Sequence, residues 1–295
     1  MAAIDPALRI GFVELAVSDL PRSTDFYERV LGLPLIAGEA DRATFGGDPE
    51  RPALVLSEIE EPTPLSPHST GLFHIAWLHP SRAALAASVR RIVGQRWPME
   101  GAADHGVSEA LYLSDPDGLG IEIYADRPRA QWERPAGGHG VKMVSLPLHL
   151  EDLLAEDQGG PVPLIAAGTG IGHVHLKVAD VPRANAFYRD ALGFEQQAQI
   201  PSAAFLAAGG YHHHIGLNSW QSQGGQPAPN TAPGLRRVEF ELSDAGSVNA
   251  VEGAIADAQP STRAARDEDG RLVLRDPDGH SLAFSPSSAG PRPTR

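Results

Sequence analysis

The sequence predicts an α+β fold built from four β-α-β-β-β modules, and three observations support this. The segment IGFVELAVSDLPRSTDFYERVLGL, which begins at Ile10, recurs as IGHVHLKVADVPRANAFYRDALGF from Ile171. The same offset relates two DPDG tetrapeptides, at 115–118 and 276–279, so the repeat spans most of each half of the chain. Finally, 31 glycines and 26 prolines among 295 residues favour many short elements joined by turns.

The first module begins with a strand and a helix. Apolar residues alternate with other residues over 13–17, which is typical of a half-buried strand. Ser18 or Asp19 can cap the helix that follows, and Gly32 ends it. A short apolar segment at 53–59 then predicts a further strand of the same module.

The second module repeats this plan. An apolar segment at 72–78 predicts a strand, and the spacing of apolar residues over 85–92 predicts a helix. Two further strands are expected on either side of the first DPDG turn, within 109–124. The second half follows the same order, with helices expected at 179–193 and near 247–258.

This repeat predicts how the chain divides along the sequence. Modules one and two occupy a first domain at 8–126, and modules three and four a second at 170–286. The segment 127–169 matches nothing in the repeat and is rich in proline and glycine, so we expect a linker with room for one short helix. Residues 287–295 are expected to form a flexible tail.

The composition excludes several classes of function. With no cysteine among the 295 residues, disulfide scaffolds, iron–sulfur clusters and thiolate zinc sites are ruled out. A formal net charge of -13 repels polyanions, so nucleic acid is not an expected partner. The N-terminus lacks the pattern of a signal peptide, and no segment approaches the ~20 apolar residues that span a bilayer. We therefore expect no membrane association and a cytoplasmic location.

Two histidines and one glutamate are candidate metal ligands. Glu122 lies on a predicted strand whose other face is apolar, and a lone glutamate there is most often solvated or ion-paired. However, His74 and His173 each begin a predicted strand of modules two and three. Two imidazoles and one carboxylate form a facial triad that leaves positions open on a divalent metal. Fe(II) is the expected ion, and Mn(II) or another divalent metal suits the same ligands.

Comparison of the two halves predicts a single metal site per chain. The residues that stand at the equivalent positions of the other modules are not matching ligands: Arg237 for His74, Phe12 for His173 and Ala283 for Glu122. One ligand set is therefore distributed over modules two and three.

The remaining histidines fall into two groups. In the run 212–214, strand alternation places His213 opposite its two neighbours, and one of the three is a candidate acid or base because histidine titrates near neutral pH. A solvent-facing edge is the alternative. His175 lies on the same face of its predicted strand as His173. We expect it either to support a ligand or to line a pocket. Surface positions are expected for the histidines in loop-like surroundings, which are His68, His79, His139, His149 and His280.

These features resemble the vicinal oxygen chelate superfamily, and within it the extradiol dioxygenases of the catechol 2,3-dioxygenase type. The resemblance rests on the paired modules and on a signature formed by His105, Leu111-Tyr112, Asp115-Pro116, Gly118 and Glu122. It implies two tandem vicinal oxygen chelate domains forming open barrels. It also implies ring cleavage of a small aromatic diol of the catechol type with O2 at an iron centre.

The resemblance further implies roles for individual residues. The metal ligands fall on His74, His173 and Glu122, and a hydrogen-bond donor to the substrate falls on His105. Tyr112 would line the pocket. The acid/base matches His213, with His214 as the alternative.

One departure from the family concerns the order of the modules. The familiar two-domain enzymes hold the metal wholly within their C-terminal pair of modules, whereas these ligands come from modules two and three. This implies that modules two and three close one metal barrel, while modules one and four close an empty one. The linker between modules two and three then becomes a candidate lid or pocket wall.

Three alternatives stay open at this point. A glyoxalase-type isomerase shares the modules but usually presents four ligands, two of them carboxylates. A metal-free binding protein of the antibiotic-resistance kind would need none of these ligands. A different oxygenase or hydrolase could use the same metal plan, because fold does not determine function. A homo-oligomer is compatible with each of them.

Overall fold

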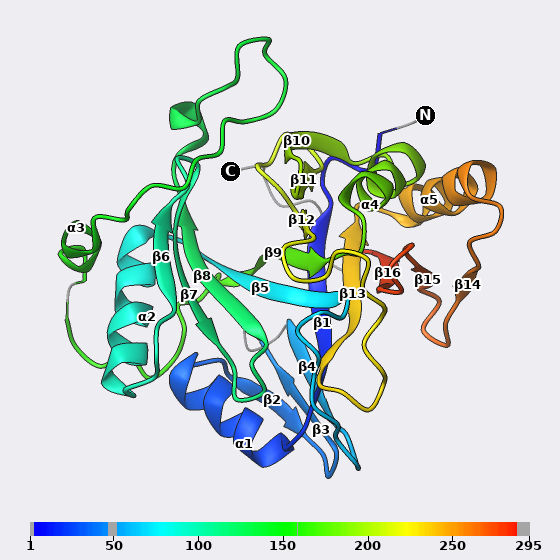
Figure 1. Ribbon diagram of the computed structural model, residues 1–295. Helices are drawn as coiled ribbons and strands as arrows, with labels where there is room; N and C mark the ends of the chain where they lie inside the picture. Colours follow the sequence, from blue (N-terminus) through cyan, green and yellow to red (C-terminus); the bar gives the residue numbers. More distant parts are fainter. Residues whose placement is uncertain (1–2, 47–51, 158, 288–295) are drawn as a thin grey trace.

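The structure is a computed structural model that describes residues 3–46, 52–157 and 159–287. The expected flexible tail at 287–295 therefore lies outside the described residues, except for Ser287. In the described chain, sixteen strands form two eight-stranded sheets, and β1 and β13 of one sheet lie beside β5 and β9 of the other (Figure 1).

The first sheet combines modules four and one. The antiparallel pair of β13 and β1 joins the two modules at its centre. Its strands, in spatial order, are β14 (Ala264–Arg266), β15 (Leu272–Arg275), β16 (Ser281–Pro286), β13 (Gly234–Leu242), β1 (Arg9–Val17), β4 (Leu54–Glu58), β3 (Arg42–Phe45) and β2 (Leu35–Gly38).

The second sheet combines modules three and two around the antiparallel pair of β9 and β5. Its strands, in spatial order, are β10 (Glu195–Ile200), β11 (Ala203–Ala207), β12 (Ile215–Asn218), β9 (Gly170–Lys177), β5 (Gly71–His79), β8 (Gly120–Asp126), β7 (Ser108–Ser114) and β6 (Gly101–Asp104). The α+β class and the predicted pairing of modules two with three and one with four are thus confirmed. Each sheet takes one module from each half of the chain.

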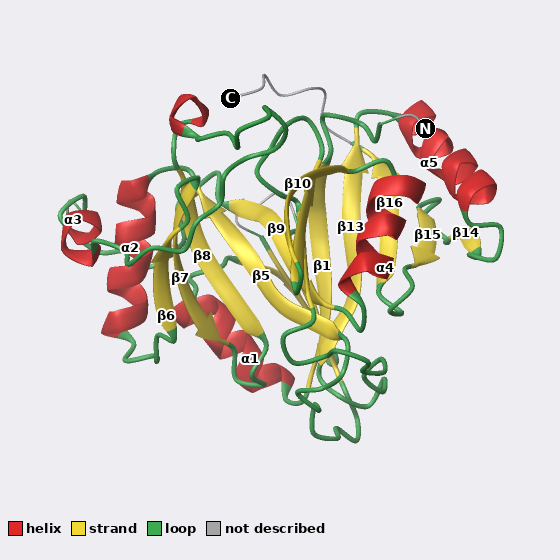
Figure 2. Cartoon of the chain, turned by 45° about the horizontal axis from the view of Figure 1, so that its top comes forward, coloured by secondary structure: helices red, strands yellow, loops and turns green. Residues whose placement is uncertain are grey.

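The helices lie around the outside of the strands (Figure 2). Helix α1 (Leu20–Asp25) is capped by Asp19, whose side chain accepts from the backbone of Arg22, and it continues as a π-helical turn η1 over Phe26–Val30. The repeat reproduces this arrangement in α4 (Val181–Ala186) and η3 (Phe187–Ala191). The longer helices of the other modules are α2 (Arg82–Gly94) and α5 (Ala245–Ala258). The linker segment contains η2 (Arg129–Gln131) and α3 (Leu150–Leu154).

The two DPDG turns connect modules of different sheets. The carboxylate of Asp115 accepts backbone hydrogen bonds within its own turn and a third from the Tyr27 hydroxyl of η1, 3.1 Å away. In the second half, Asp276 accepts from Tyr188 at 2.8 Å in the same way. The recurring tyrosine–aspartate contact therefore fixes each sheet against a helix of the other.

Two of the five histidines expected at the surface are buried, so that expectation is wrong for them. His79 ends β5 and bonds the Ser88 hydroxyl at 2.9 Å, and His280 bonds the Asp276 carboxylate at 2.7 Å. Local sequence did not reveal these partners. In the chain as far as it is described, no helix combines the length and apolar character needed to cross a bilayer. The cytoplasmic location and the oligomeric state stay predictions.

Candidate metal centre

The three candidate ligands lie on three adjacent strands. His74 is on β5, Glu122 on β8 and His173 on β9, and β5 lies between the other two strands. Ala76 of β5 pairs with Glu122 on one side and with His173 on the other. Because side chains alternate along a strand, His74 shares the face of Ala76, and the small alanine leaves room among the three larger side chains.

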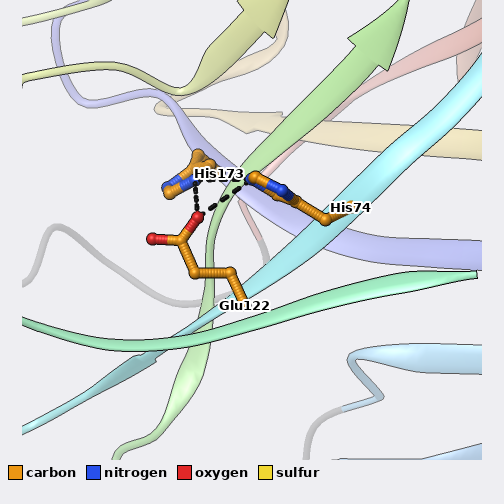
Figure 3. Close-up of side chains that lie close together, drawn as sticks. All are labelled: His74, Glu122 and His173. Carbon is orange, nitrogen blue, oxygen red and sulfur yellow. Dashed lines mark hydrogen bonds and ion pairs between the residues drawn. The ribbon is translucent and has the colours of Figure 1, made fainter. Parts of the chain in front are cut away.

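The ligand atoms of these residues form a compact triangle (Figure 3). Nε2 of His74 lies 3.0 Å, and Nε2 of His173 3.2 Å, from the same oxygen of Glu122. The two imidazole nitrogens are 3.3 Å apart. Among the described residues, His74, Glu122 and His173 form a candidate metal-binding group, because one potential ligand atom from each lies within 4.8 Å of the others.

Burial and mutual contacts determine the protonation states of His173 and Glu122. At most 5% of each residue is exposed. Burial lowers the pKa of His173 to about 4, so its imidazole is neutral at neutral pH. Burial alone would raise the pKa of Glu122, but the contacts with His173 and His74 hold it well below its usual value. The site therefore offers a neutral imidazole and a carboxylate, the protonation states that metal binding requires.

The size of the triangle fits a divalent metal. Ligands that sit ~2.0–2.2 Å from an ion and at right angles to one another are about 3 Å apart. The observed separations of 3.0, 3.2 and 3.3 Å match that spacing. Two histidines and one carboxylate on one face of an ion leave positions open for other molecules.

A second contact connects the ligands with the signature histidine. Tyr112 of β7 lies directly opposite Glu122 of β8, and its ring is 5.8 Å from that of His74. Its hydroxyl is 2.6 Å from Nε2 of His105. Nδ1 of His105 lies 2.8 Å from the Val144 carbonyl, which can only accept, so in the neutral imidazole Nε2 accepts from the Tyr112 hydroxyl. Burial, followed by the charge of Glu122, raises the pKa of Tyr112 and keeps the phenol neutral.

The histidine run lies in the loop before β12 and not in a strand, so the predicted alternation of faces does not apply to it. The ring centre of His213 is nonetheless 4.0 Å from that of His173, whereas His212 is 6.0 Å away. His214 instead lines a separate cavity, together with Tyr211. The geometry therefore favours His213 over His214 as the group beside the ligands.

A chain of hydrogen bonds orients His213. Nε2 of His212 lies 2.9 Å from the carboxylate of Asp126, which can only accept. The Nδ1 atom of a neutral His212 is then an acceptor, and Nδ1 of His213, 2.8 Å away, donates to it. Nε2 of His213 is left with its lone pair and without a hydrogen bond to any described residue. Sequence reasoning missed Asp126, although it continues the alternation 122, 124, 126 on β8.

His175 lies on the same side of the sheet as the ligands. Its ring centre is 5.0 Å from that of His74 and 5.2 Å from that of Phe73. Burial lowers its pKa well below the usual value. It therefore packs against a ligand as an uncharged aromatic side chain.

The linker contacts both ends of the metal-bearing sheet. On the module-two side, Val144 bonds His105, and Leu146 exchanges two backbone hydrogen bonds with Asp104. On the module-three side, Val141 donates to the carbonyl of Gln197 in β10. The linker thus positions His105 through a carbonyl and forms part of the surroundings of the site.

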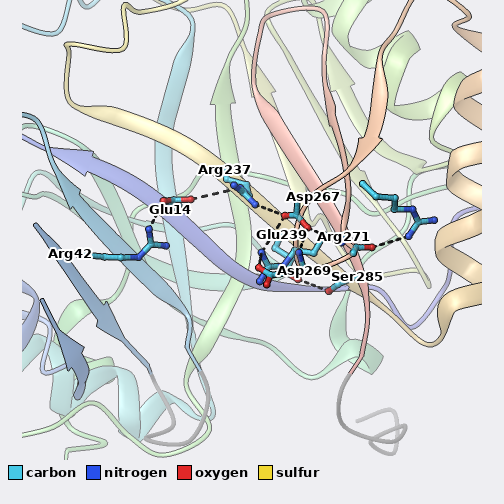
Figure 4. Close-up of polar contacts among 10 residues, drawn as sticks. Glu14, Arg42, Arg237, Glu239, Asp267, Asp269, Arg271 and Ser285 are labelled. Atoms are coloured by element: carbon cyan, nitrogen blue, oxygen red, sulfur yellow. Dashed lines mark hydrogen bonds and ion pairs between the residues drawn. The ribbon is translucent and has the colours of Figure 1, made fainter.

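The equivalent face of the first sheet carries ion pairs (Figure 4). Arg237, which stands where His74 stands in the second sheet, pairs with Asp267 at 3.0 Å and lies 3.7 Å from Glu14. Arg271 pairs with Asp269 at 2.7 Å. A cavity of about 590 Å³ lies among these side chains.

The chain is similar to known proteins over most of its length. A family model described as the Glyoxalase/Bleomycin resistance protein/Dioxygenase superfamily matches 9–123 and 170–284. A protein named catechol-2,3-dioxygenase from Bacillus subtilis (strain 168) is 42% identical over 238 residues, which are 80% of this chain and 83% of the relative.

Solved structures with low sequence identity share the fold. A putative dioxygenase from Bacillus subtilis subsp. subtilis str. 168 gives a TM-score of 0.66 at 15% identity, covering 98% of this chain and 87% of the other. Glyoxalase I from Zea mays gives a TM-score of 0.55 at 18% identity, covering 94% of this chain and 92% of the other. At these identities the similarity concerns the fold alone.

Proposed function

The chain belongs to the Glyoxalase/Bleomycin resistance protein/Dioxygenase superfamily, and we propose that it is an extradiol dioxygenase that opens the ring of a catechol-type aromatic diol with O2. The name of its 42% identical relative supports the dioxygenase activity. The observation that carries the proposal is the buried triangle of His74, Glu122 and His173, because it provides one carboxylate and two imidazoles and leaves metal positions open.

The ligand set favours this activity over that of a glyoxalase-type isomerase. Such an isomerase is expected to use two carboxylates, whereas the group found among the described residues contains Glu122 alone. We propose Fe(II) as the metal, with Mn(II) as the alternative. A metal held here would bring the diol oxygens and O2 into one coordination sphere, which supplies orientation and charge stabilisation.

His213 is the proposed acid/base. The hydrogen bonds from Asp126 through His212 leave a lone pair on Nε2 of His213, next to the ring of His173. Burial lowers the pKa of His213, so the side chain is neutral and able to accept a proton from a diol hydroxyl. The same atom can return that proton to an oxygen of the product.

Tyr112 and His105 form the proposed opposite wall. The Tyr112 hydroxyl is neutral and donates to His105, which the linker holds through Val144. A bound diol could exchange for either partner of this hydrogen bond. The pair therefore offers a polar group on the Glu122 side of the site, while His213 provides one on the His173 side.

The proposal is tested by anaerobic loading with Fe(II), followed by a catechol and O2. We expect O2 uptake in proportion to the iron bound, a yellow ring-cleavage product, and both atoms of 18O2 in that product. Parallel loading with Mn(II) compares the two metals. No uptake with any of several catechols, at confirmed metal occupancy, would contradict the dioxygenase activity. If the loaded chain retained neither Fe(II) nor Mn(II), the ligand assignment would be contradicted.

A further inference from the structure

A second site lies where the two halves of the chain meet. A cavity of about 200 Å³ is lined by the ends of β9 and β13, the start of β5, the loops at 65–70 and 227–233, and the second DPDG turn. The proposed metal ligands and catalytic residues do not line it. Its volume is below the ~300–1,000 Å³ of typical pockets for drug-sized ligands but several times the ~30 Å³ share of one water. It therefore suits a group of a few heavy atoms.

Lys177 is the most unusual residue of this cavity. It ends β9 and is only 6% exposed. Its ammonium donates one long hydrogen bond, 3.5 Å to the carbonyl of Pro67, and forms no ion pair with a described carboxylate. Burial lowers its pKa. A buried cation without a counter-charge is costly, and this cost is offset when an anion binds beside it.

Two arginines line the same cavity and form no ion pair with a described residue, although the charge of Glu14 also acts on Arg236. The guanidinium of Arg236 donates to the backbone carbonyls of Asn230 and Ala232, at 2.7 and 2.8 Å. That of Arg275 donates to the carbonyl of Gly279 at 2.6 Å. Carbonyl oxygens orient these side chains but do not neutralise them, because they carry no net charge.

The acidic and titratable neighbours of the cavity have partners outside it, although Oδ2 of Asp278 and Nε2 of His280 are buried without a hydrogen-bond partner among the described residues. Asp278 accepts from the backbone of Ala179 and from Arg183, at 2.9 and 2.7 Å. His280 bonds the carboxylate of Asp276. The three lining cations, Lys177, Arg236 and Arg275, thus outnumber the one lining carboxylate, that of Asp278. This local excess is opposite in sign to the net charge of the chain, which is -13.

We propose that this cavity binds a small oxyanion, the phosphate or carboxylate group of a ligand, through Lys177, Arg236 and Arg275. Ammonium and guanidinium groups form charge-assisted hydrogen bonds with such oxygens. The site is distinct from the proposed metal centre and does not depend on the function proposed for it.

The chain offers a matched control because Lys142 and Lys177 are its two lysines. Lys142 is exposed and pairs with Glu133. Inorganic phosphate and acetate would be titrated separately into the full chain at constant ionic strength, by calorimetry. We expect saturable binding of at least one of them to the wild type and to Lys142→Met. In Lys177→Met the Kd should rise about tenfold or more, because a charge-assisted hydrogen bond is lost.

A second measurement does not require the variant to fold. In protein labelled with 13C-lysine, two lysine Cε signals are expected, and the anion should shift that of Lys177 saturably but not that of Lys142. Phosphate binding alone would identify a phosphate site, and acetate binding alone a carboxylate site. Absence of saturable binding of both anions to the wild type would overturn the proposal. So would binding that leaves the Lys177 signal unchanged or persists undiminished in Lys177→Met.

Discussion

The two sheets use one scaffold for opposite electrostatic arrangements. In the second sheet Ala76 pairs with Glu122, and in the first sheet the corresponding pair is Glu239 and Ala283. The carboxylate of the second sheet thus lies on β8, whereas that of the first sheet lies on β13, the strand that corresponds to β5. Around Glu122 are two imidazoles, whereas Glu239 accepts from Ser285 and lies 3.5 Å from Arg271.

The difference shows what the repeat must supply to make a metal site. Imidazoles keep a lone pair for a metal when burial holds them neutral, whereas arginine has no lone pair to donate. In the first sheet the arginines also pair with the carboxylates around them. The same backbone therefore presents free ligand atoms on one face and internally compensated charge on the other.

The largest effect that tests this comparison is expected for Glu122→Gln. The amide keeps the shape of the side chain but removes the charge that offsets the metal. We expect loss of bound metal and a fall in ring-cleavage rate of about a thousandfold or more, since a metal supplies several kcal/mol of charge stabilisation. Metal analysis and O2 uptake provide the two measurements.

Glu239→Gln is the matched control for this variant. Glu239 is also buried, with 6% exposure, on the equivalent face of the other sheet. Removal of the Glu239 charge should leave metal content and O2 uptake unchanged. Equal loss of metal in both variants would show that the effect arises from destabilisation of the fold rather than from ligation.

A smaller effect is expected when the acid/base is removed. His213→Gln should lower kcat about a hundredfold while metal content stays the same, because general acid–base catalysis contributes ~10²–10⁴. His214→Gln removes a neighbouring histidine that faces the other cavity, and kcat should change little. Steady-state kinetics of the two metal-loaded variants distinguishes them. A larger loss in His214→Gln would reverse the assignment.

Two buried histidines, one on β9 of the second sheet and one directly before β16 of the first, should respond to pH in opposite directions. The pKa of His173 is lowered to about 4, so its contribution to stability is present above pH ~6.5 and is lost as pH falls toward 4. Burial would lower the pKa of His280, but Asp276 raises it above its usual value. The contribution of His280 is therefore present below pH ~6.5 and is lost as pH rises through the folded-state pKa.

Urea unfolding of the metal-free protein between pH 5 and 8 measures both contributions. The free-energy difference between wild type and His173→Gln should grow with pH, by about 2 kcal/mol from pH 5 to pH 7. The difference between wild type and His280→Gln should shrink over the same range. Parallel pH trends in the two variants would contradict the opposite shifts in pKa.

The sequence predicted the parts of this comparison that depend on local periodicity. The repeat established the modules, and alternation along β8 placed Glu122 opposite its apolar neighbours Ile121 and Ile123. Contacts between distant segments were not predictable in this way. Asp126 meets His212 across 86 positions of sequence.

The histidine run shows the same limit of periodicity. A period of two has meaning only within a strand, and the run lies in the loop before β12. Its orientation is determined by tertiary contacts, namely the hydrogen bonds of His212 and the packing of His213 on His173. Likewise, His79 and His280 are buried because Ser88 and Asp276 provide partners.

The smallest effect is expected for Arg237→Met, which removes the residue equivalent to His74. Asp267 keeps Arg271 as a partner at 3.3 Å, and Glu14 keeps Arg42 at 3.4 Å, so no carboxylate is left without a cation. We expect the free energy of unfolding to fall by about 1 kcal/mol or less, and by less at high salt, where partly exposed pairs are screened. Urea unfolding at two salt concentrations measures this. Metal content and O2 uptake should be unchanged, whereas His74→Met should lose both. A loss of metal in Arg237→Met would mean that the charged sheet supports the ligands, and the two faces could then no longer be treated as independent.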